Sequence, residues 1–192
     1  PLIGRFNVGN ALAALAAAGT FGVPLKEGAL SLATFAGTAR RLQHVGEEGG
    51  VTVIDDFAHN PDKIGASIKT LTEHFDRVFL VYQPHGYGPL RSFRPLYEQA
   101  FASALRPTDK LVVTEPAYFG GTVQKTDDAK SLVETLAGQS LDATYAENRE
   151  GFRPLIDDAS SGDALVVMGA RDDSLSDFAR SLLADLQKGG AK

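Results

Sequence analysis

From Arg41 onward, short apolar runs of strand character alternate with segments in which apolar residues recur at helical spacing. The intervening segments place apolar residues three and four positions apart, as amphipathic helices do. Strand, helix and strand repeated in this way predict a parallel sheet with helices on both faces. We therefore expect an α/β domain with a Rossmann-like, mostly parallel sheet. The expected strands are residues 41–45, 51–55, 78–82, 111–114, 143–145 and 164–168.

The first of these strands is expected to depart from the parallel order. The turn Glu47-Glu48-Gly49-Gly50 joins runs 41–45 and 51–55 as a hairpin, so run 41–45 should be an antiparallel edge strand. Upstream, residues 8–18 predict a short, buried helix, because they are nearly all Ala, Leu and Val, and residues 26–34 predict a second one. We place a domain boundary near Phe35, so that residues 1–35 are a helical piece of another domain and residues 36–192 form the α/β domain.

One segment combines a strand end with polar chemistry. Val53-Ile54-Asp55-Asp56-Phe57-Ala58-His59-Asn60-Pro61 ends a β-branched run in two carboxylates and a histidine, and its proline opens a helix. Ligands of open α/β sheets bind beyond the carboxyl ends of the strands, where Asp56 and His59 are expected to lie. A structural alternative stays open: Asp56 caps the helix and His59 is a satisfied loop residue, since Asp is a favoured cap.

Composition and the missing motifs narrow the possible functions. A net charge of -5 without a basic block argues against nucleic-acid binding and favours small-molecule partners. The absence of Cys excludes disulfides and thiolate metal sites, and the four His are not at metal-ligand spacing, so no metal ligands are assigned. The chain lacks the dipeptide Gly-Lys of a P-loop, the G-x-S-x-G elbow of a hydrolase and the third glycine of a dinucleotide fingerprint.

Targeting signals are also missing from the sequence. No apolar run approaches about 18 residues, and the start lacks the basic and apolar regions of a signal peptide, so a cytoplasmic location without membrane contact is the default expectation. Because Pro1 cannot be an initiator, we expect the chain to be a piece of a longer polypeptide.

Three segments together resemble one family, the Mur ligases of bacterial cell-wall synthesis and their folylpolyglutamate synthetase relatives. The stretch from Gly4 to Ala14 is similar to the family's G-x-[HF]-N-x-x-N-x-x-A-A helix at the end of the central ATPase domain. Gly37-Thr38-Ala39-Arg40-Arg41-Leu42 resembles the G-x-x-R-R-[FL] start of the C-terminal domain. Asp55-Asp56-Phe57-Ala58-His59-Asn60-Pro61 resembles the D-D-Y-[AG]-H-[HN]-P signature. The three lie in the family's order and at its spacing.

Within the family, the stretch from Tyr82 to Arg91 looks most like the Q-P-H-R-Y-[ST]-R-T-R stretch of the members that add L-alanine to UDP-N-acetylmuramate. Met168-Gly169-Ala170 resembles their closing M-G-A-G segment. The likeness is incomplete, because Gly86 and Pro89 stand where those members carry two further arginines. The opening Leu-Ile-Gly-Arg-Phe-Asn is closer to members that add the third stem residue, so the amino acid or peptide stays open.

The resemblance implies an ATP-dependent amide ligase of peptidoglycan synthesis or recycling. ATP phosphorylates a UDP-muramyl carboxylate, and the acyl phosphate is attacked by the amine of an amino acid or peptide. In the family, the phosphates and Mg²⁺ are held mainly by the central domain, which would precede Pro1. We therefore expect these residues alone to be inactive and assign them no catalytic residue. The alternative is a non-catalytic binding or scaffold module that retains the fold.

The resemblance also assigns residues to the nucleotide. Asn7 would bind the adenine, with a helix N-cap as its structural alternative. Arg41 would reach the ATP phosphates, and Arg40 would be its solvated neighbour. Asp56 would accept hydrogen bonds from the ribose hydroxyls, in a site that faces solvent when empty.

Three residues are assigned to the amino-acid substrate. His59 would contact the nucleotide or the amino acid, and His85 and Arg91 would bind the carboxylate of that amino acid. The structural alternative for Arg91 is an ordinary surface charge. Asp55 is expected to support its loop instead of touching a ligand.

Overall fold

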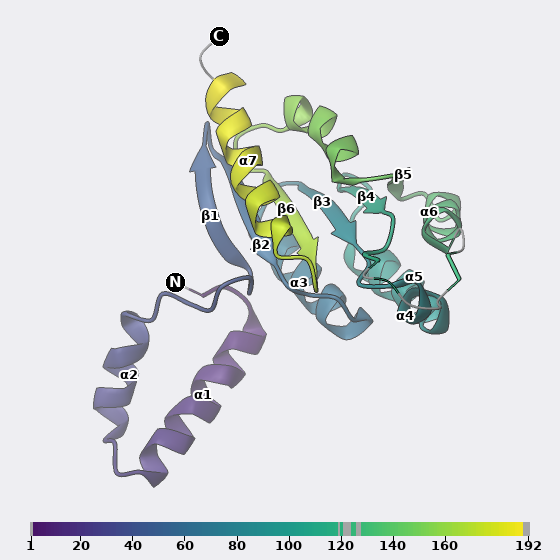
Figure 1. Cartoon of the computed structure of the whole chain (residues 1–192). Helices are drawn as coiled ribbons and strands as arrows, with labels where there is room; N and C mark the ends of the chain where they lie inside the picture. Colours follow the sequence, from purple (N-terminus) through teal and green to yellow (C-terminus); the bar gives the residue numbers. More distant parts are fainter. Residues whose placement is uncertain (1, 119, 121–123, 126–127, 190–192) are drawn as a thin grey trace. The chain divides into compact units, whose positions relative to one another are not determined.

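The computed structural model describes residues 2–118, 120, 124–125 and 128–189. The chain divides into two compact units, Pro1–Ala39 and Arg40–Lys192 (Figure 1). No helix in the described part of the chain is long and apolar enough to cross a membrane.

The described residues of the second unit form one six-stranded sheet. Its strand order is β1-β2-β6-β3-β4-β5 (Figure 1). β1 pairs antiparallel with β2, and every other neighbouring pair is parallel. The expected α/β fold with a mostly parallel sheet and an antiparallel edge strand is confirmed. The strands are β1 (Gln43–Glu48), β2 (Val51–Asp56), β3 (Val78–Gln83), β4 (Lys110–Thr114), β5 (Asp142–Ala146) and β6 (Ala164–Gly169).

The hairpin between β1 and β2 turns on Gly49 and Gly50, whose φ angles are 57° and 79°. Two-residue hairpin turns of this kind need positive φ at both positions, which glycine adopts without strain. The start of β1 differs from the expected residue 41. Arg40 and Leu42 have φ angles of 56° and 43°, so the backbone there is left-handed and extended pairing begins only at Gln43.

Helices cover both faces of the sheet. On one face, Phe79, Val81 and Val167 belong to an apolar cluster that also contains Phe178 of α7 and Phe152 of the 3₁₀ helix η1. On the other face, the Tyr82 ring lies 5.4 Å from Phe101 and 6.1 Å from Tyr97, both on α5. The helices of this unit are α3 (Pro61–His74), α4 (Tyr87–Ser92), α5 (Arg94–Ala104), α6 (Asp128–Gly138), η1 (Arg149–Asp158) and α7 (Ser174–Gly189).

The N-terminus of α3 decides one of the open alternatives. Asn60 is the N-cap: its side chain accepts a hydrogen bond of 2.9 Å from the Lys63 N–H, and Pro61 occupies the first turn. The Asp56 carboxylate instead accepts from the Leu42 N–H at 3.3 Å. The alternative in which Asp56 caps this helix is therefore wrong.

The first unit consists of α1 (Arg5–Thr20) and α2 (Leu25–Ala33). The expectation of a buried first helix is wrong, because α1 contains no buried residue. Val8 and Leu12 are 62% and 63% exposed. α1 packs against α2, and a pair of helices covers only one side of each member, which leaves the other apolar side chains open.

Candidate functional site

The candidate site lies where β2, β6 and β3 end at the same edge of the sheet. Asp56 at the end of β2 is in register with Met168, and Gly169 at the end of β6 is in register with Gln83. Parallel pairing therefore brings the loops that follow these three strands together. The His59 and His85 rings meet edge to face with centroids 5.0 Å apart, so two of the predicted site residues lie in contact.

Asp56 is more enclosed than expected. It is only 3% exposed, which overturns the expectation of a solvent-facing carboxylate. Its Oδ2 is buried and accepts no hydrogen bond of good geometry from the described part of the chain. Burial raises the pKa of the Asp56 carboxyl above its usual value, and the Ser67 hydroxyl and the Leu42 N–H act in the opposite direction. The carboxylate thus retains an unused acceptor.

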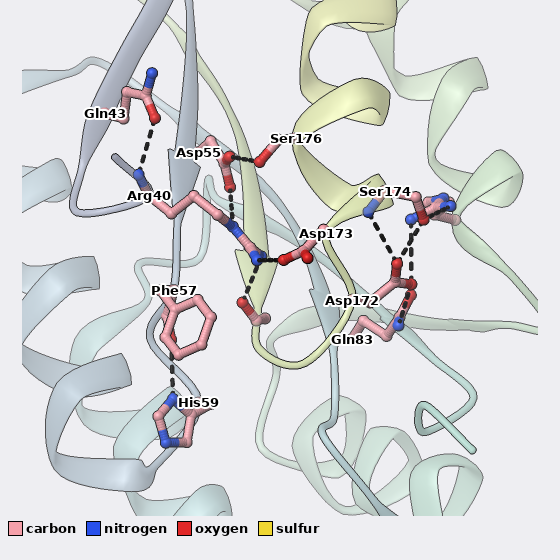
Figure 2. A network of polar contacts seen from close by, with 12 residues as sticks. Arg40, Gln43, Asp55, Phe57, His59, Gln83, Asp172, Asp173, Ser174 and Ser176 are labelled. Atoms are coloured by element: carbon pink, nitrogen blue, oxygen red, sulfur yellow. Dashed lines mark hydrogen bonds and ion pairs between the residues drawn. The ribbon is translucent and has the colours of Figure 1, made fainter. Parts of the chain in front are cut away.

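The backbone of the His59 loop is fixed by tyrosines on the neighbouring elements. The His59 carbonyl accepts hydrogen bonds from the Tyr97 hydroxyl at 2.8 Å and from the Tyr82 hydroxyl at 3.4 Å. The His59 ring Nδ1 lies 2.9 Å from the Phe57 carbonyl. These contacts hold the ring against His85 at the sheet edge (Figure 2 shows the bond to Phe57).

His85 lies in the loop after β3 and is half-buried. Its Nδ1 is buried and has no hydrogen-bond partner among the described residues. Burial lowers the pKa of His85, and the electrostatic effect of the neighbouring His59 and Arg171 side chains acts in the same direction. Since the ordinary pKa of histidine is about 6.5, the His85 ring is uncharged at neutral pH.

Arg40 is the clearest correction to the sequence analysis. It is 9% exposed instead of solvated. Its Nε lies 3.5 Å from Asp55 Oδ1, and its Nη2 donates to the Gly169 carbonyl at 2.9 Å (Figure 2). The Ser176 hydroxyl donates to the other Asp55 oxygen at 2.5 Å. Successive residues of a strand face opposite sides of the sheet. Asp55 therefore points away from the side of Asp56 and pairs with Arg40.

Arg41 is exposed, and its guanidinium carbon lies 5.5 Å from the centre of the Phe57 ring. The Arg40 guanidinium lies 4.9 Å from the centre of the same ring. An arginine within about 6 Å of a ring face gains cation–π attraction. Phe57 thus orients the predicted phosphate-binding arginine, a role that its position in the Asp-Asp-Phe-Ala-His segment did not reveal.

Arg91 lies in α4 and faces the start of α6. Its Nε forms an ion pair of 3.2 Å with Asp128, and its Nη2 donates to the Gln124 carbonyl at 3.2 Å. The predicted carboxylate-binding arginine is therefore already engaged by a carboxylate of the chain.

Asn7 belongs to the other compact unit. Gly4 is the N-cap of α1, so the N-cap alternative for Asn7 is wrong. The Asn7 amide donates to the Ile3 carbonyl at 2.7 Å, and its oxygen accepts from the Asn10 amide at 3.2 Å.

A carboxylate that the sequence analysis did not select lies beyond the end of β4. Glu115 accepts hydrogen bonds from the Tyr87 hydroxyl at 2.8 Å and from the Tyr145 hydroxyl at 2.5 Å. Burial and Glu115 raise the pKa of Tyr87 to about 12, so its hydroxyl remains a donor at neutral pH. The Ala117 N–H also donates to the Pro84 carbonyl at 2.8 Å. These bonds tie the loop that carries His85 to β4 and β5.

The described carboxylates and histidines form no metal-binding arrangement. Within the described ranges, no three or more His, Cys, Asp or Glu side chains are grouped so as to hold a metal ion. Asp55 is paired with Arg40, and Asp172 accepts from Gln83 and Ser174 (Figure 2). These carboxylates do not fit a Mg²⁺ site.

Known proteins resemble this chain over most of its length. Residues 40–171 match the family model described as "Mur ligase, glutamate ligase domain". A UDP-N-acetylmuramate–L-alanine ligase of Lachnospira eligens is 34% identical over 171 residues, which cover 88% of this chain and 36% of that protein. The ligase of the same name from Rhizobium etli is 32% identical over 191 residues. These residues make up 97% of this chain and 39% of the relative.

The solved structures give the same assignment. The crystal structure of the UDP-N-acetylmuramate-alanine ligase of Thermotoga maritima is 26% identical, with a TM-score of 0.74 over 98% of this chain and 39% of the ligase. The chain therefore spans well under half the length of the relatives that it matches. Because the family model covers more than half of these 192 residues, the chain belongs to the Mur ligase family.

Proposed function

We propose that the chain is the C-terminal part of an ATP-dependent amide ligase, which joins an amino acid or peptide to a UDP-N-acetylmuramate-type carboxylate in peptidoglycan synthesis or recycling. The observation that carries this proposal is the likeness to UDP-N-acetylmuramate–L-alanine ligases. The match to the Rhizobium etli ligase covers 97% of this chain. In this proposal, residues 1–35 are the end of the central ATPase domain, and residues 36–192 are the C-terminal domain. Support comes from the family match, which begins at Arg40.

The proposed reaction has two steps. The γ-phosphoryl group of ATP passes to the muramyl carboxylate, and the amine then attacks the acyl carbon, which releases phosphate and forms the amide. The C-terminal part contributes by holding the nucleoside and the amino acid in place. Correct orientation of two reactants can be worth an effective molarity of about 10⁵ to 10⁸ M.

The proposed nucleotide contacts are Asn7, Arg41, Asp56 and His59. The exposed Arg41 offers a guanidinium fork that suits phosphate oxygens. The unused Oδ2 of Asp56 is an acceptor, which a ribose hydroxyl would satisfy as donor. Since this atom is buried, the contact requires the carboxylate to turn toward the crevice. Because no described carboxylates of this chain are grouped to hold Mg²⁺, we assign the metal and most phosphate contacts to the central domain.

The proposed amino-acid contacts are His59, His85 and Arg91. The two rings lie together at the sheet edge, where a substrate held against the nucleotide would be bound. For Arg91 to bind the substrate carboxylate, it must exchange its ion pair with Asp128 for that contact.

The overall proposal is tested on the full-length protein that contains this chain. Purified protein is expected to release ADP over many turnovers only when ATP, a UDP-muramyl acceptor and an amino acid are all present. Tight ATP or acceptor binding without any ADP release would instead identify a non-catalytic member of the family.

In that full-length enzyme, Asp56→Ala is expected to raise the KM for ATP about tenfold or more, since a hydrogen bond to a charged group is worth roughly 1.5–3 kcal/mol. Steady-state kinetics with varied ATP measure the effect. Asp62→Ala, which removes an exposed carboxylate from the first turn of α3, is the matched control and should leave the KM unchanged. Unchanged ATP kinetics with a lowered melting temperature would make Asp56 a structural residue only.

The 192 residues alone are expected to hydrolyse no ATP and to form no amide bond, because the family's phosphate-binding loop belongs to the central domain. Phosphate release by the purified chain in the presence of ATP and Mg²⁺ measures this. Turnover above background that disappears in Asp56→Ala would contradict the proposed division of labour between the domains.

A further inference from the structure

Arg171 has a backbone conformation that is unusual for arginine. It follows the end of β6, and its φ of 64° lies in the left-handed region that glycine prefers. The residue is exposed. A non-glycine residue with positive φ at the end of a central strand is a reason to look for a function of its side chain.

The sheet register brings Arg171 to the candidate site. β3 and β6 run parallel, with Gln83 paired to Gly169, and His85 and Arg171 each lie two residues beyond this pair. Gln83 also donates a hydrogen bond of 2.9 Å to Asp172, which ties the two loops together (Figure 2). The lowered pKa of His85 has the positive charge of Arg171 among its causes. The Arg171 guanidinium is thus within electrostatic reach of the His85 ring.

The acidic residues beside Arg171 are engaged elsewhere. Asp172 accepts hydrogen bonds from the Ser174 N–H and from Gln83, and it lies 3.5 Å from Arg149. Asp173 lies 3.5 Å from Arg40. In the described ranges, the Arg171 side chain has neither a hydrogen bond nor an ion pair, so its charge is available to a ligand.

We propose that Arg171 is the principal cation for the carboxylate of the amino-acid substrate beside His85, with Arg91 as a secondary contact; this inference rests on the proposed ligase function, with L-alanine as the amino acid, as in the names of the relatives. A bound carboxylate needs a cation, and the uncharged His85 ring does not supply one. Arg91 is already paired with Asp128. Gly86 in the loop after β3 and Pro89 in α4 provide no charge. Arg171 lies in the loop between β6 and α7, and its guanidinium has the geometry to bind a carboxylate through two hydrogen bonds.

The decisive variant is Arg171→Gly in the full-length enzyme. Glycine adopts a φ of 64° without strain, so the melting temperature should not fall and a kinetic defect will not reflect misfolding. We expect the KM for L-alanine to rise about tenfold or more, because charge-assisted contacts are the strong ones, and the KM for ATP to change less than about twofold. Arg180→Ala, which removes an exposed cation from α7, is the matched control and should change neither value.

Arg91→Ala separates the two candidate cations in the same assay. If Arg171 holds the carboxylate, Arg91→Ala should change the KM for L-alanine less than Arg171→Gly does. An active enzyme in which Arg171→Gly has wild-type kinetics for L-alanine would overturn the inference. A rise in the KM for ATP alone would assign the guanidinium to a phosphate and would also overturn it.

A binding readout keeps the inference testable if the full-length protein proves inactive, which would count against the proposed function. The 192-residue chain is titrated with L-alanine and with L-alanine methyl ester while the ring resonances of His85 are followed by NMR. We expect L-alanine to shift these resonances in the wild type and not in Arg171→Gly, and the ester to have no effect. Equal responses to L-alanine and to the ester, or none to L-alanine, would contradict carboxylate binding at Arg171.

Discussion

Arg40→Ala is expected to lower the free energy of unfolding of this chain by about 3–5 kcal/mol, because removing one partner of a buried ion pair leaves the other charge uncompensated. Asp55 is 1% exposed and would retain the Ser176 hydroxyl as its hydrogen-bonding partner in the network of Figure 2. The Gly169 carbonyl would also lose its 2.9 Å donor. Equilibrium urea unfolding, followed by circular dichroism, measures the loss.

The neighbouring arginine provides the control for this experiment. Arg41 is exposed and contacts the same Phe57 ring. Arg41→Ala should therefore lower the free energy of unfolding by less than about 1 kcal/mol. The double variant Arg40→Ala/Asp55→Ala should be less destabilised than the sum of its single changes, since removal of both partners leaves no unpaired charge. Equal losses for Arg40→Ala and Arg41→Ala would show that the buried network adds nothing to stability.

Asp109→Ala, at the opposite edge of the sheet, should lower the free energy of unfolding by about 1–3 kcal/mol, because the buried Val78 N–H would lose its acceptor. The Asp109 side chain is fully buried and accepts hydrogen bonds from the Val78 N–H at 2.8 Å and the Arg106 N–H at 2.7 Å. It also forms an ion pair of 2.8 Å with the Arg106 guanidinium. Alanine would leave the first amide of β3 without its acceptor, while the Arg106 guanidinium would keep the Thr72 and Phe75 carbonyls, and urea unfolding would measure the loss.

Two further variants show whether charge or hydrogen bonding matters at this position. Asp109→Asn keeps one acceptor oxygen and the side-chain volume, so it should be less destabilising than Asp109→Ala. Glu134→Ala, an exposed position on α6, should change stability by less than about 0.5 kcal/mol. A loss for Asp109→Ala no larger than that for Glu134→Ala would contradict a structural role for the buried carboxylate.

The strands were predictable because their signal is local. Residues 78–82 and 164–168 are unbroken apolar runs, and strands covered on both faces need such runs whatever lies beside them. The hairpin at Gly49 and Gly50 was equally local, since two positive φ angles favour glycine. The start of β1 was missed because the left-handed backbone at Arg40 and Leu42 carries no sequence signal in residues other than glycine.

The candidate site was predictable only in part. Asp56 and His59 follow a β-branched run, so the sequence predicted that they lie at the end of a strand. In the structure, β2 ends at Asp56 and His59 follows three residues later. Whether the carboxylate is open or enclosed depends on residues that fold over it, such as Leu42, and the expectation of a solvent-facing Asp56 was wrong for this reason. Arg40 and Arg41 are adjacent in sequence, and only the buried Asp55 decides which of them is enclosed.

The sequence by itself determined the strands and most helices of this protein, its α/β class and the polar residues that follow the strands, because periodicity and turn chemistry act over a few residues. Only the tertiary structure decided which of these residues meet. β6 is the last strand in the chain, yet it lies between β2 and β3, so that Arg171 comes beside His85 across 86 positions of sequence. The physical reason is that strand order follows from the packing of whole apolar faces, and that packing is not encoded in any single segment.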